Sequence, residues 1–297
     1  AHKRCWMRCV PAIADGILLA RYACPMPHLQ PVPLKLALRN TADIELWPAS
    51  LLRAHGNAHA RLLARARRVL RRKRDGVYLA AELDDGLHAM VPGLAREPGL
   101  RAAQAALRDA PPHSRNGLEH VTPLPLHRLH ERLQWLGLDA ESYSAQVGLP
   151  LVPEPNWLAF AGFDQFQRPL WLHIGAARAW LRMQAAALAD GVMLDAISGY
   201  RSHDYQWGIL ERKQARGLSM QDILAVNAAP GFSEHHSGLA LDIGTPDSPP
   251  AEEIFEATPA FAWLHSHARA YGFAMSYPRD NPHGIIYEPW HWRFGEA

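Results

Sequence analysis

The stretch GFSEHHSGLALDIGTP, residues 231–246, places two adjacent histidines before a run of small and apolar residues that contains a carboxylate. Residues 239–243 alternate as a strand does, with leucine and isoleucine on one face and Asp242 on the other. A buried Asp is costly unless it is paired or bound to a cation. The pattern therefore predicts a strand that presents Asp242 to a charged partner.

His235 is the nearest candidate partner in the sequence. A bend at Gly238 would return its imidazole to the side of Asp242, and two turns of helix would align the same two side chains. Gly231, Gly238 and the flanking prolines favour a loop followed by a strand. Both geometries bring His235 and Asp242 together, and His236 is the alternative to His235.

The C-terminal stretch IIYEPWHWRFG, residues 285–295, supplies a third ligand type. We predict a strand over 285–287 that ends at Pro289, with Glu288 and His291 on either side of it. His235, Asp242 and His291 would leave Zn²⁺ with an open fourth position, as in catalytic sites. Water at such a zinc ion has its pKa lowered to about 7, and Glu288 is the candidate base.

Composition excludes some classes of protein. Hydrophobic residues make up 48% of the 297 residues and charged residues 20%, which indicates a globular chain. The 31 basic and 29 acidic residues nearly cancel, so charge predicts no nucleic-acid partner. No apolar run approaches the roughly 18 residues of a membrane span. Cys5, Cys9 and Cys24 lack a paired CxxC spacing, so we interpret them as free thiols, with a metal site as the alternative.

Residues 1–112 are predicted to form an N-terminal region of unknown function, and 113–297 the domain that carries the histidine and carboxylate motifs, with a linker near 111–116. The basic segment 61–74 has apolar residues at helical spacing. It predicts an amphipathic helix whose arginines face solvent or an anionic lipid, nucleic acid or wall polymer. A hairpin is predicted around Asp85-Gly86, and helices over 100–110, 174–191, 203–217 and 219–229.

Four motifs together resemble the VanY-type D-alanyl-D-alanine carboxypeptidases: SGYRSHDYQ (198–206), SEHHSGLALD (233–242), YGFAMSYP (271–278) and YEPWHWR (287–293). They occur in the order of that family with comparable spacing, and the resemblance is strongest over 170–297. It implies an α+β domain with a mainly antiparallel sheet flanked by helices, a fold shared with the Hedgehog signalling domain. It also implies one bound zinc ion.

The resemblance implies a role for each matching residue. His235, Asp242 and His291 would be the metal ligands, and Glu288 the catalytic base. Arg201 would stabilise the developing oxyanion. The remaining positions near the substrate are Gln206, Ser233, which would bind the terminal carboxylate, and Tyr277 and Trp290, which would shape the pocket. One departure is Ser276, where many relatives have a basic residue.

The expected activity is zinc-dependent removal of the terminal D-alanine from peptidoglycan stem peptides or their precursors. One alternative is an L,D-carboxypeptidase or cross-link endopeptidase of the same fold. Another is a noncatalytic, zinc-stabilised module that binds the cell wall or a protein. A wall substrate implies the cell envelope or periplasm, whereas a chain without a leader would act on cytoplasmic precursors. The sequence does not determine the oligomeric state.

Overall fold

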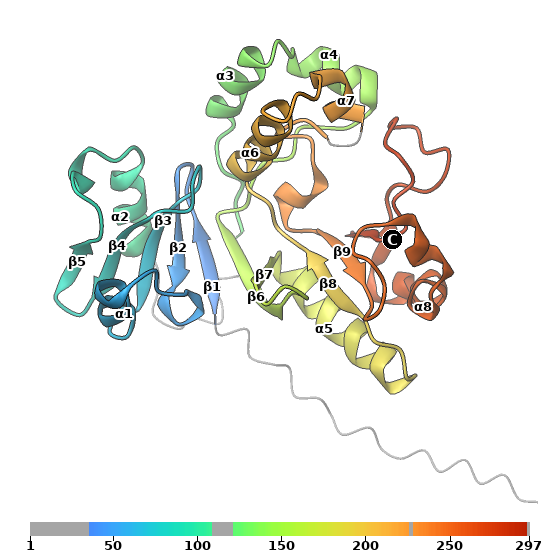
Figure 1. The fold of residues 1–297 in the computed structure, drawn as a ribbon, viewed down its shortest axis with the longest axis horizontal. Coiled ribbons are helices and arrows are strands. Elements are labelled where there is room, and N and C mark those ends of the chain that lie inside the picture. The colour runs from blue at the N-terminus through green and yellow to red at the C-terminus, as the bar shows by residue number, and fades with distance from the viewer. Residues whose placement is uncertain (1–35, 109–120, 226–227, 296–297) are drawn as a thin grey trace, which may run out of the picture. The chain divides into compact units, whose positions relative to one another are not determined.

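Two antiparallel sheets organise the chain. The computed structural model describes residues 36–108, 121–225 and 228–295 (Figure 1). The three cysteines and the predicted linker 111–116 lie outside these residues. A sheet of seven strands has the order β5-β4-β3-β2-β1-β6-β7, and a sheet of four has the order β10-β11-β9-β8. With helices packed against both sheets, the predicted α+β class is confirmed.

Strand β1 joins the N-terminal strands to the rest of the chain, because it pairs with β2 on one side and β6 on the other. The division at residue 112 stays a prediction. The strands are β1 (Ala37–Asn40), β2 (Ile44–Pro48), β3 (Arg68–Arg72), β4 (Tyr78–Leu83), β5 (Gly86–Ala89), β6 (Trp157–Phe163), β7 (Pro169–Leu172), β8 (Asp195–Ser198), β9 (Ala240–Gly244), β10 (Phe273–Met275) and β11 (His291–Phe294).

Helices occur at the four predicted places, 100–110, 174–191, 203–217 and 219–229. Three of them end earlier than predicted, because residues 190–191, 215–217 and 228–229 are turn or coil, and residues 109–110 and 226–227 lie outside the described ranges. The α-helices are α1 (Asn57–Leu63), α2 (Leu100–Arg108), α3 (His127–Trp135), α4 (Ala140–Val147), α5 (Ile174–Ala189), α6 (His203–Gln214), α7 (Met220–Ala225) and α8 (Pro259–His267). Short 3₁₀ turns are η1 (Ala49–Leu51), η2 (Leu94–Arg96), η3 (Glu234–Ser237), η4 (Glu253–Ala257) and η5 (Ala268–Tyr271). None of the helices in the described residues is long and apolar enough to cross a membrane.

The prediction of one basic helix over 61–74 is wrong. Helix α1 ends at Leu63, and residues 68–72 form the strand β3 between β2 and β4. Arg68 pairs with Glu82 on β4, and Arg71 with Glu45 on β2. Cross-strand charge pairs therefore replace the expected basic helix face. The predicted hairpin at Asp85-Gly86 is confirmed by the pairing of β4 with β5.

Helix α5 and its loops form the centre of the main core. Its buried face includes Ala176, Trp180, Met183 and Ala187, at the spacing of one helix face, and packs against β6 and β7 (Figure 1). His173 caps the helix, its Nδ1 accepting a hydrogen bond from an amide of the first turn. This core supports β9, whose five residues are all buried.

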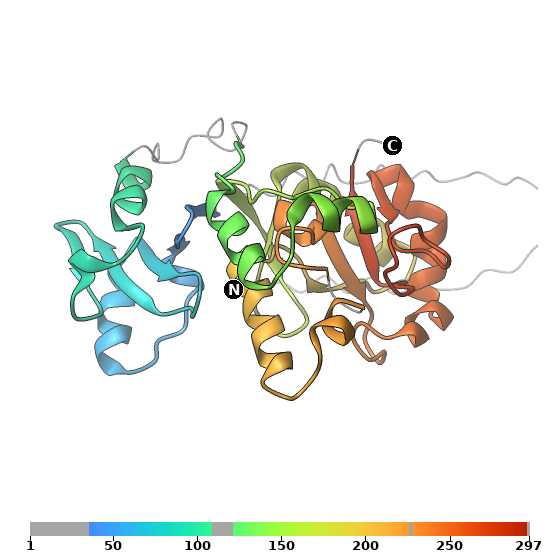
Figure 2. The same cartoon turned by 90° about the horizontal axis from the view of Figure 1, so that it is seen from above.

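The predicted sequence of loop then strand in 231–244 is confirmed. The turn η3 ends at Gly238, which has a φ of +70° and lies against β7. A Cβ atom there would lie 2.5 Å from Leu158 and 2.9 Å from the backbone nitrogen of His173. Only glycine combines this backbone conformation with so close an approach. Strand β9 follows, pairing with β8 and β11 (Figure 2).

The C-terminal strand follows the Glu288–His291 motif, whereas it was predicted to precede it. Residues 285–287 form no strand, and β11 begins at His291. Isolated hydrogen bonds hold the preceding segment in place of strand pairing. Asn281 donates to the carbonyl of Ile285, and the amide of Glu288 donates to the carbonyl of Tyr277. Since His291 pairs directly with Asp242 in the β9–β11 register, the two motifs meet at neighbouring strand positions.

Candidate metal centre

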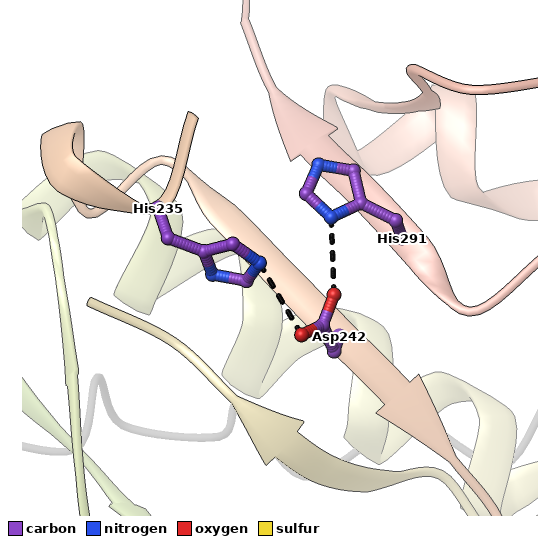
Figure 3. Close-up of side chains that lie close together, drawn as sticks. All are labelled: His235, Asp242 and His291. Carbon is purple, nitrogen blue, oxygen red and sulfur yellow. Dashed lines mark hydrogen bonds and ion pairs between the residues drawn. The ribbon is translucent and has the colours of Figure 1, made fainter. Parts of the chain in front are cut away.

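Three buried side chains converge where η3, β9 and β11 meet (Figure 3). His235 Nε2 lies 3.2 Å from Asp242 Oδ2, and His291 Nδ1 lies 3.0 Å from Asp242 Oδ1. One ligand atom from each residue lies within 4.8 Å of the others. The structure thus brings together the three residues that the sequence predicted as ligands.

This donor set fits a zinc ion. Two imidazole nitrogens and one carboxylate are typical zinc ligands, and three protein ligands leave a position for water or substrate. Bonds of about 2.0–2.1 Å in a tetrahedron separate neighbouring ligand atoms by about 3.3 Å. The separations of 3.0 and 3.2 Å around Asp242 are close to that value. The three donor groups therefore lie close enough together to hold one ion.

Both histidines are oriented by a second contact. His235 donates from Nδ1 to the carbonyl of Gly199, at 2.7 Å, which leaves Nε2 facing Asp242. His291 donates from Nε2 to Glu234 Oε2, at 2.9 Å, which leaves Nδ1 facing Asp242. Such outer contacts fix the tautomer of a ligating histidine and raise its basicity.

The electrostatics of the cluster favour a cation. Burial lowers the pKa of His235, which keeps it neutral as a ligand requires. Burial opposes ionisation of Asp242, but the charges and hydrogen bonds of His235 and His291 hold its pKa well below the usual range. Burial likewise opposes charge on His291, but hydrogen bonds with Asp242 and Glu234 raise its pKa to about 10. The site therefore concentrates negative charge around basic nitrogens.

Glu288, the predicted base, lies at the edge of the cluster. Its Oε2 is 3.8 Å from His291 Nδ1, and its side chain is 17% exposed. Burial raises its pKa to about 7, with the nearby carboxylate of Asp242 adding to the effect. Glu288 thus lies within reach of both the candidate ligands and solvent.

Arg201 and Gln206 flank the cluster on the other side. Arg201 lies 3.5 Å from Asp242 Oδ2 and donates to Gln206 Oε1 at 3.3 Å. Gln206 in turn donates to the carbonyl of Ala228. Arg201 Nε is buried and has no hydrogen-bond partner within the part of the chain that the structure describes. The side chain as a whole is 20% exposed, so Arg201 borders both the cluster and solvent.

The other predicted site residues lie around this group. Ser233 is buried and immediately precedes the turn that carries His235. The ring of Tyr277 lies 4.7 Å from that of His291, so it borders the cluster. Trp290 is buried in the main hydrophobic core, so its role is in the packing next to the site.

The alternative ligand His236 points away from the cluster, so this alternative is wrong. Its Nδ1 donates to the carbonyl of Arg201 at 2.6 Å, and its Nε2 accepts from the amide of Gly231. Both nitrogens are occupied by backbone groups, and burial lowers its pKa. His236 is therefore a neutral link between two loops of the site.

Sequence reasoning assigned no role to Glu234. Its carboxylate accepts from His291 and from Ser276 Oγ, the latter at 2.6 Å, and lies 3.5 Å from Arg293. Ser276, which stands where many relatives have a basic residue, therefore donates to Glu234, the hydrogen-bond partner of the candidate ligand His291. A carboxylate directly before His235 was the available signal, but its partner lies far away in the sequence.

We expect Glu234→Ala to weaken zinc binding about 10–100-fold, because His291 loses the partner that fixes its tautomer. Competition with a chromogenic chelator measures this affinity without any substrate. Ser276→Ala, which removes only a donor to Glu234, should have a much smaller effect. Zinc binding by Glu234→Ala equal to that of the unaltered protein would show that His291 needs no such support.

Comparison with known proteins agrees with this geometry. The VanY family model, described as D-alanyl-D-alanine carboxypeptidase, matches residues 169–296. The bifunctional D-Ala-D-Ala dipeptidase and carboxypeptidase VanXYC of Enterococcus gallinarum is 31% identical over 150 residues, covering 48% of this chain and 75% of that protein. The chain belongs to the VanY family of D-alanyl-D-alanine carboxypeptidases. All the candidate site residues lie within the VanY match.

Other known carboxypeptidases are similar over a smaller share of their length. A D-alanyl-D-alanine carboxypeptidase of Enterococcus faecium is 33% identical, covering 45% of this chain and 40% of that protein. YodJ of Bacillus subtilis (strain 168) is 35% identical, covering 50% and 57%. The chain thus spans less than two thirds of these relatives. The solved LdcB LD-carboxypeptidase is 32% identical with a TM-score of 0.42, covering 45% of this chain and 64% of that one.

Proposed function

We propose that this protein is a zinc-dependent D,D-carboxypeptidase that hydrolyses the terminal D-Ala-D-Ala amide of peptidoglycan stem peptides. One observation carries the proposal: His235, Asp242 and His291 surround a common point, with the carboxylate of Glu288 beside it. A purely structural zinc site has four protein ligands and no need of a base. Membership of the VanY family supports the same chemistry.

Each residue of the site has a task in amide hydrolysis. Zinc held by the three ligands would supply a Lewis acid and lower the pKa of the attacking water. Glu288 takes the proton of that water and then passes it to the leaving amine of D-alanine. Its position between the ligands and solvent, with a 17% exposed side chain, suits both transfers.

Arg201 is placed to stabilise the oxyanion that forms when the carbonyl is attacked. Its guanidinium lies beside Asp242, and Nε has no partner in the described residues. Gln206 holds the other end of the guanidinium, so the side chain, which is 20% exposed, is already oriented before substrate binds. Ser233, at the start of the turn η3, remains our candidate for the terminal carboxylate, and Tyr277 for a wall of the pocket.

The test is release of D-alanine from a synthetic stem pentapeptide ending in D-Ala-D-Ala by the zinc-loaded protein. Defined muropeptides, analysed by mass, distinguish the alternatives: loss of one D-alanine supports the proposal. Cleavage only of a tetrapeptide would indicate an L,D-carboxypeptidase, and cleavage of a cross-link an endopeptidase. Binding without cleavage under any metal condition would indicate a noncatalytic module and overturn the proposal.

We also propose the cell envelope as the place of action, because stem peptides of the wall are found there. The alternative is a cytoplasmic enzyme acting on the precursors. Fractionation of cells that produce the protein, with detection by antibody, distinguishes the two locations.

A further inference from the structure

The segment 199–203 carries much of the site, and it is held partly from outside the VanY match. The carbonyl of Gly199 orients His235, and Arg201 follows two residues later. Strand β7 supports the segment from below, because the amide of Tyr200 donates to the carbonyl of Trp171 at 2.9 Å. Further contacts of this segment lead to residues 36–155, for which the proposed function gives no role.

Glu154 is the centre of these contacts. Glu154 is only 4% exposed. Its Oε2 accepts hydrogen bonds from Lys73 Nζ at 2.5 Å, Tyr200 OH at 2.5 Å and Asn40 Nδ2 at 3.1 Å. Its Oε1 accepts from the amide of His203 at 2.8 Å. Glu154 therefore holds Tyr200 and His203, the residues on either side of Arg201 and Ser202.

The N-terminal strands supply the partners of Glu154. Lys73 follows β3 directly, and its side chain is 1% exposed. Asn40 ends β1 and also donates to the hydroxyl of Tyr200 at 2.8 Å. The ring of Tyr200 packs on the cluster formed by Leu38, Leu158 and Trp171. One face of Tyr200 is thus built largely by strands that precede the VanY match.

A second route runs through two histidines. The rings of His203 and His236 lie 4.4 Å apart, edge to face, and His236 donates to the carbonyl of Arg201. His203 is itself fixed by its contact with the carbonyl of Val152. The carbonyl of Arg201 is therefore held by His236, whose ring packs on His203, a residue whose amide donates to Glu154.

The charge of Glu154 is fully balanced. Burial opposes its ionisation, but the positive charge of Lys73, the charge of His203 and the hydrogen bonds from Lys73 and Tyr200 together hold its pKa below the usual range. A buried ion pair adds little stability by itself compared with apolar packing, so its presence points to a need for defined geometry. That need is met here by the turn that presents Arg201.

We propose that Glu154 and Lys73 are positioning residues for Arg201. The N-terminal strands β1 and β3 would then form part of the scaffold of the active site. Glu154 and Lys73 touch neither the substrate nor the metal ligands, and act by fixing Tyr200 and His203. The inference rests on the proposed function for its kinetic consequence. Its structural consequence does not depend on the substrate: segment 199–206 becomes more mobile when the hydrogen bonds of Glu154 are lost.

The kinetic test is a double-mutant cycle between Glu154→Gln and Arg201→Ala, measured on the stem pentapeptide. Displacement of a catalytic group is costly, so we expect Glu154→Gln alone to lower kcat/KM by about tenfold to a hundredfold. In the Arg201→Ala background the same change should have less than about a twofold effect, because residues in one network are not additive. An equal loss in both backgrounds would overturn the positioning role and indicate a general structural one.

Hydrogen exchange of backbone amides provides the readout that needs no activity. In Glu154→Gln, exchange in peptides that cover 199–206 should accelerate, while peptides of α5 keep their protection. Glu82→Gln is the matched control, since it breaks the Arg68 pair of the same N-terminal sheet away from Tyr200. It should leave both kcat/KM and exchange at 199–206 unchanged.

The two failures are distinguishable. If the unaltered protein cleaves no peptide but Glu154→Gln accelerates exchange at 199–206, the proposed function fails and the scaffold role stands. Unchanged exchange in a folded Glu154→Gln protein overturns the scaffold role. Should that variant not fold, Tyr200→Phe removes only the hydroxyl that donates to Glu154, and the same two measurements decide.

Discussion

Glu288→Gln is expected to abolish peptide hydrolysis while zinc binding persists. The amide has the size of the carboxylate but cannot accept the proton of water or return it to the leaving amine. Loss of a positioned general base costs about 100-fold to 10,000-fold in rate. Alanine release from the stem pentapeptide measures the loss, and the ligands His235, Asp242 and His291 are all retained.

Two measurements make the result specific to proton transfer. The zinc affinity of Glu288→Gln should match that of the unaltered protein, because Glu288 lies 3.8 Å from His291 rather than within the ligand group. Peptide binding, measured by calorimetry, should also persist. A variant that hydrolyses the peptide at more than about a tenth of the normal rate would remove Glu288 from the mechanism and leave another group as the base.

The metal cluster was predictable because its residues lie in short motifs where glycine and proline restrict the backbone. The glycines of 231–244 favoured a loop and then a strand, and β9 follows the turn at Gly238. Alternation then placed Asp242 correctly. The strand predicted over 285–287 was wrong because the β9–β11 register, a long-range interaction, begins pairing at His291. Local pattern contains no information about that register.

Charges balanced by distant partners could not be predicted. The arginines of 61–74 suggest one basic face when read locally, but β3 pairs them with carboxylates of β2 and β4. Glu154 lies 81 residues from Lys73 and 46 from Tyr200, so no single sequence motif contains Glu154 together with these partners. Glu234 was adjacent to a predicted ligand, yet its bond to His291 spans 57 residues. In each case the fold supplies the partner.

Asp242→Asn is expected to remove zinc binding, and with it nearly all activity. Asp242 is the one carboxylate among the three candidate ligands and lies between both imidazoles, at 3.2 and 3.0 Å. An amide brings no negative charge, and one of its two ends is a donor that repels a cation. The loss of affinity should therefore exceed the about 10–100-fold that removal of an outer partner causes.

Thermal unfolding gives a readout of this loss that is independent of substrate. A ligand that binds only the folded state at 100 times its Kd stabilises it by about 2.7 kcal/mol. Zinc should therefore raise the melting temperature of the unaltered protein and leave that of Asp242→Asn unchanged. Asp164→Asn is the matched control, because this buried carboxylate pairs with Arg168 and lies outside the ligand group. A zinc-induced rise in Asp242→Asn equal to that of the control would place the ion elsewhere, since a site that loses its only carboxylate ligand cannot keep its affinity.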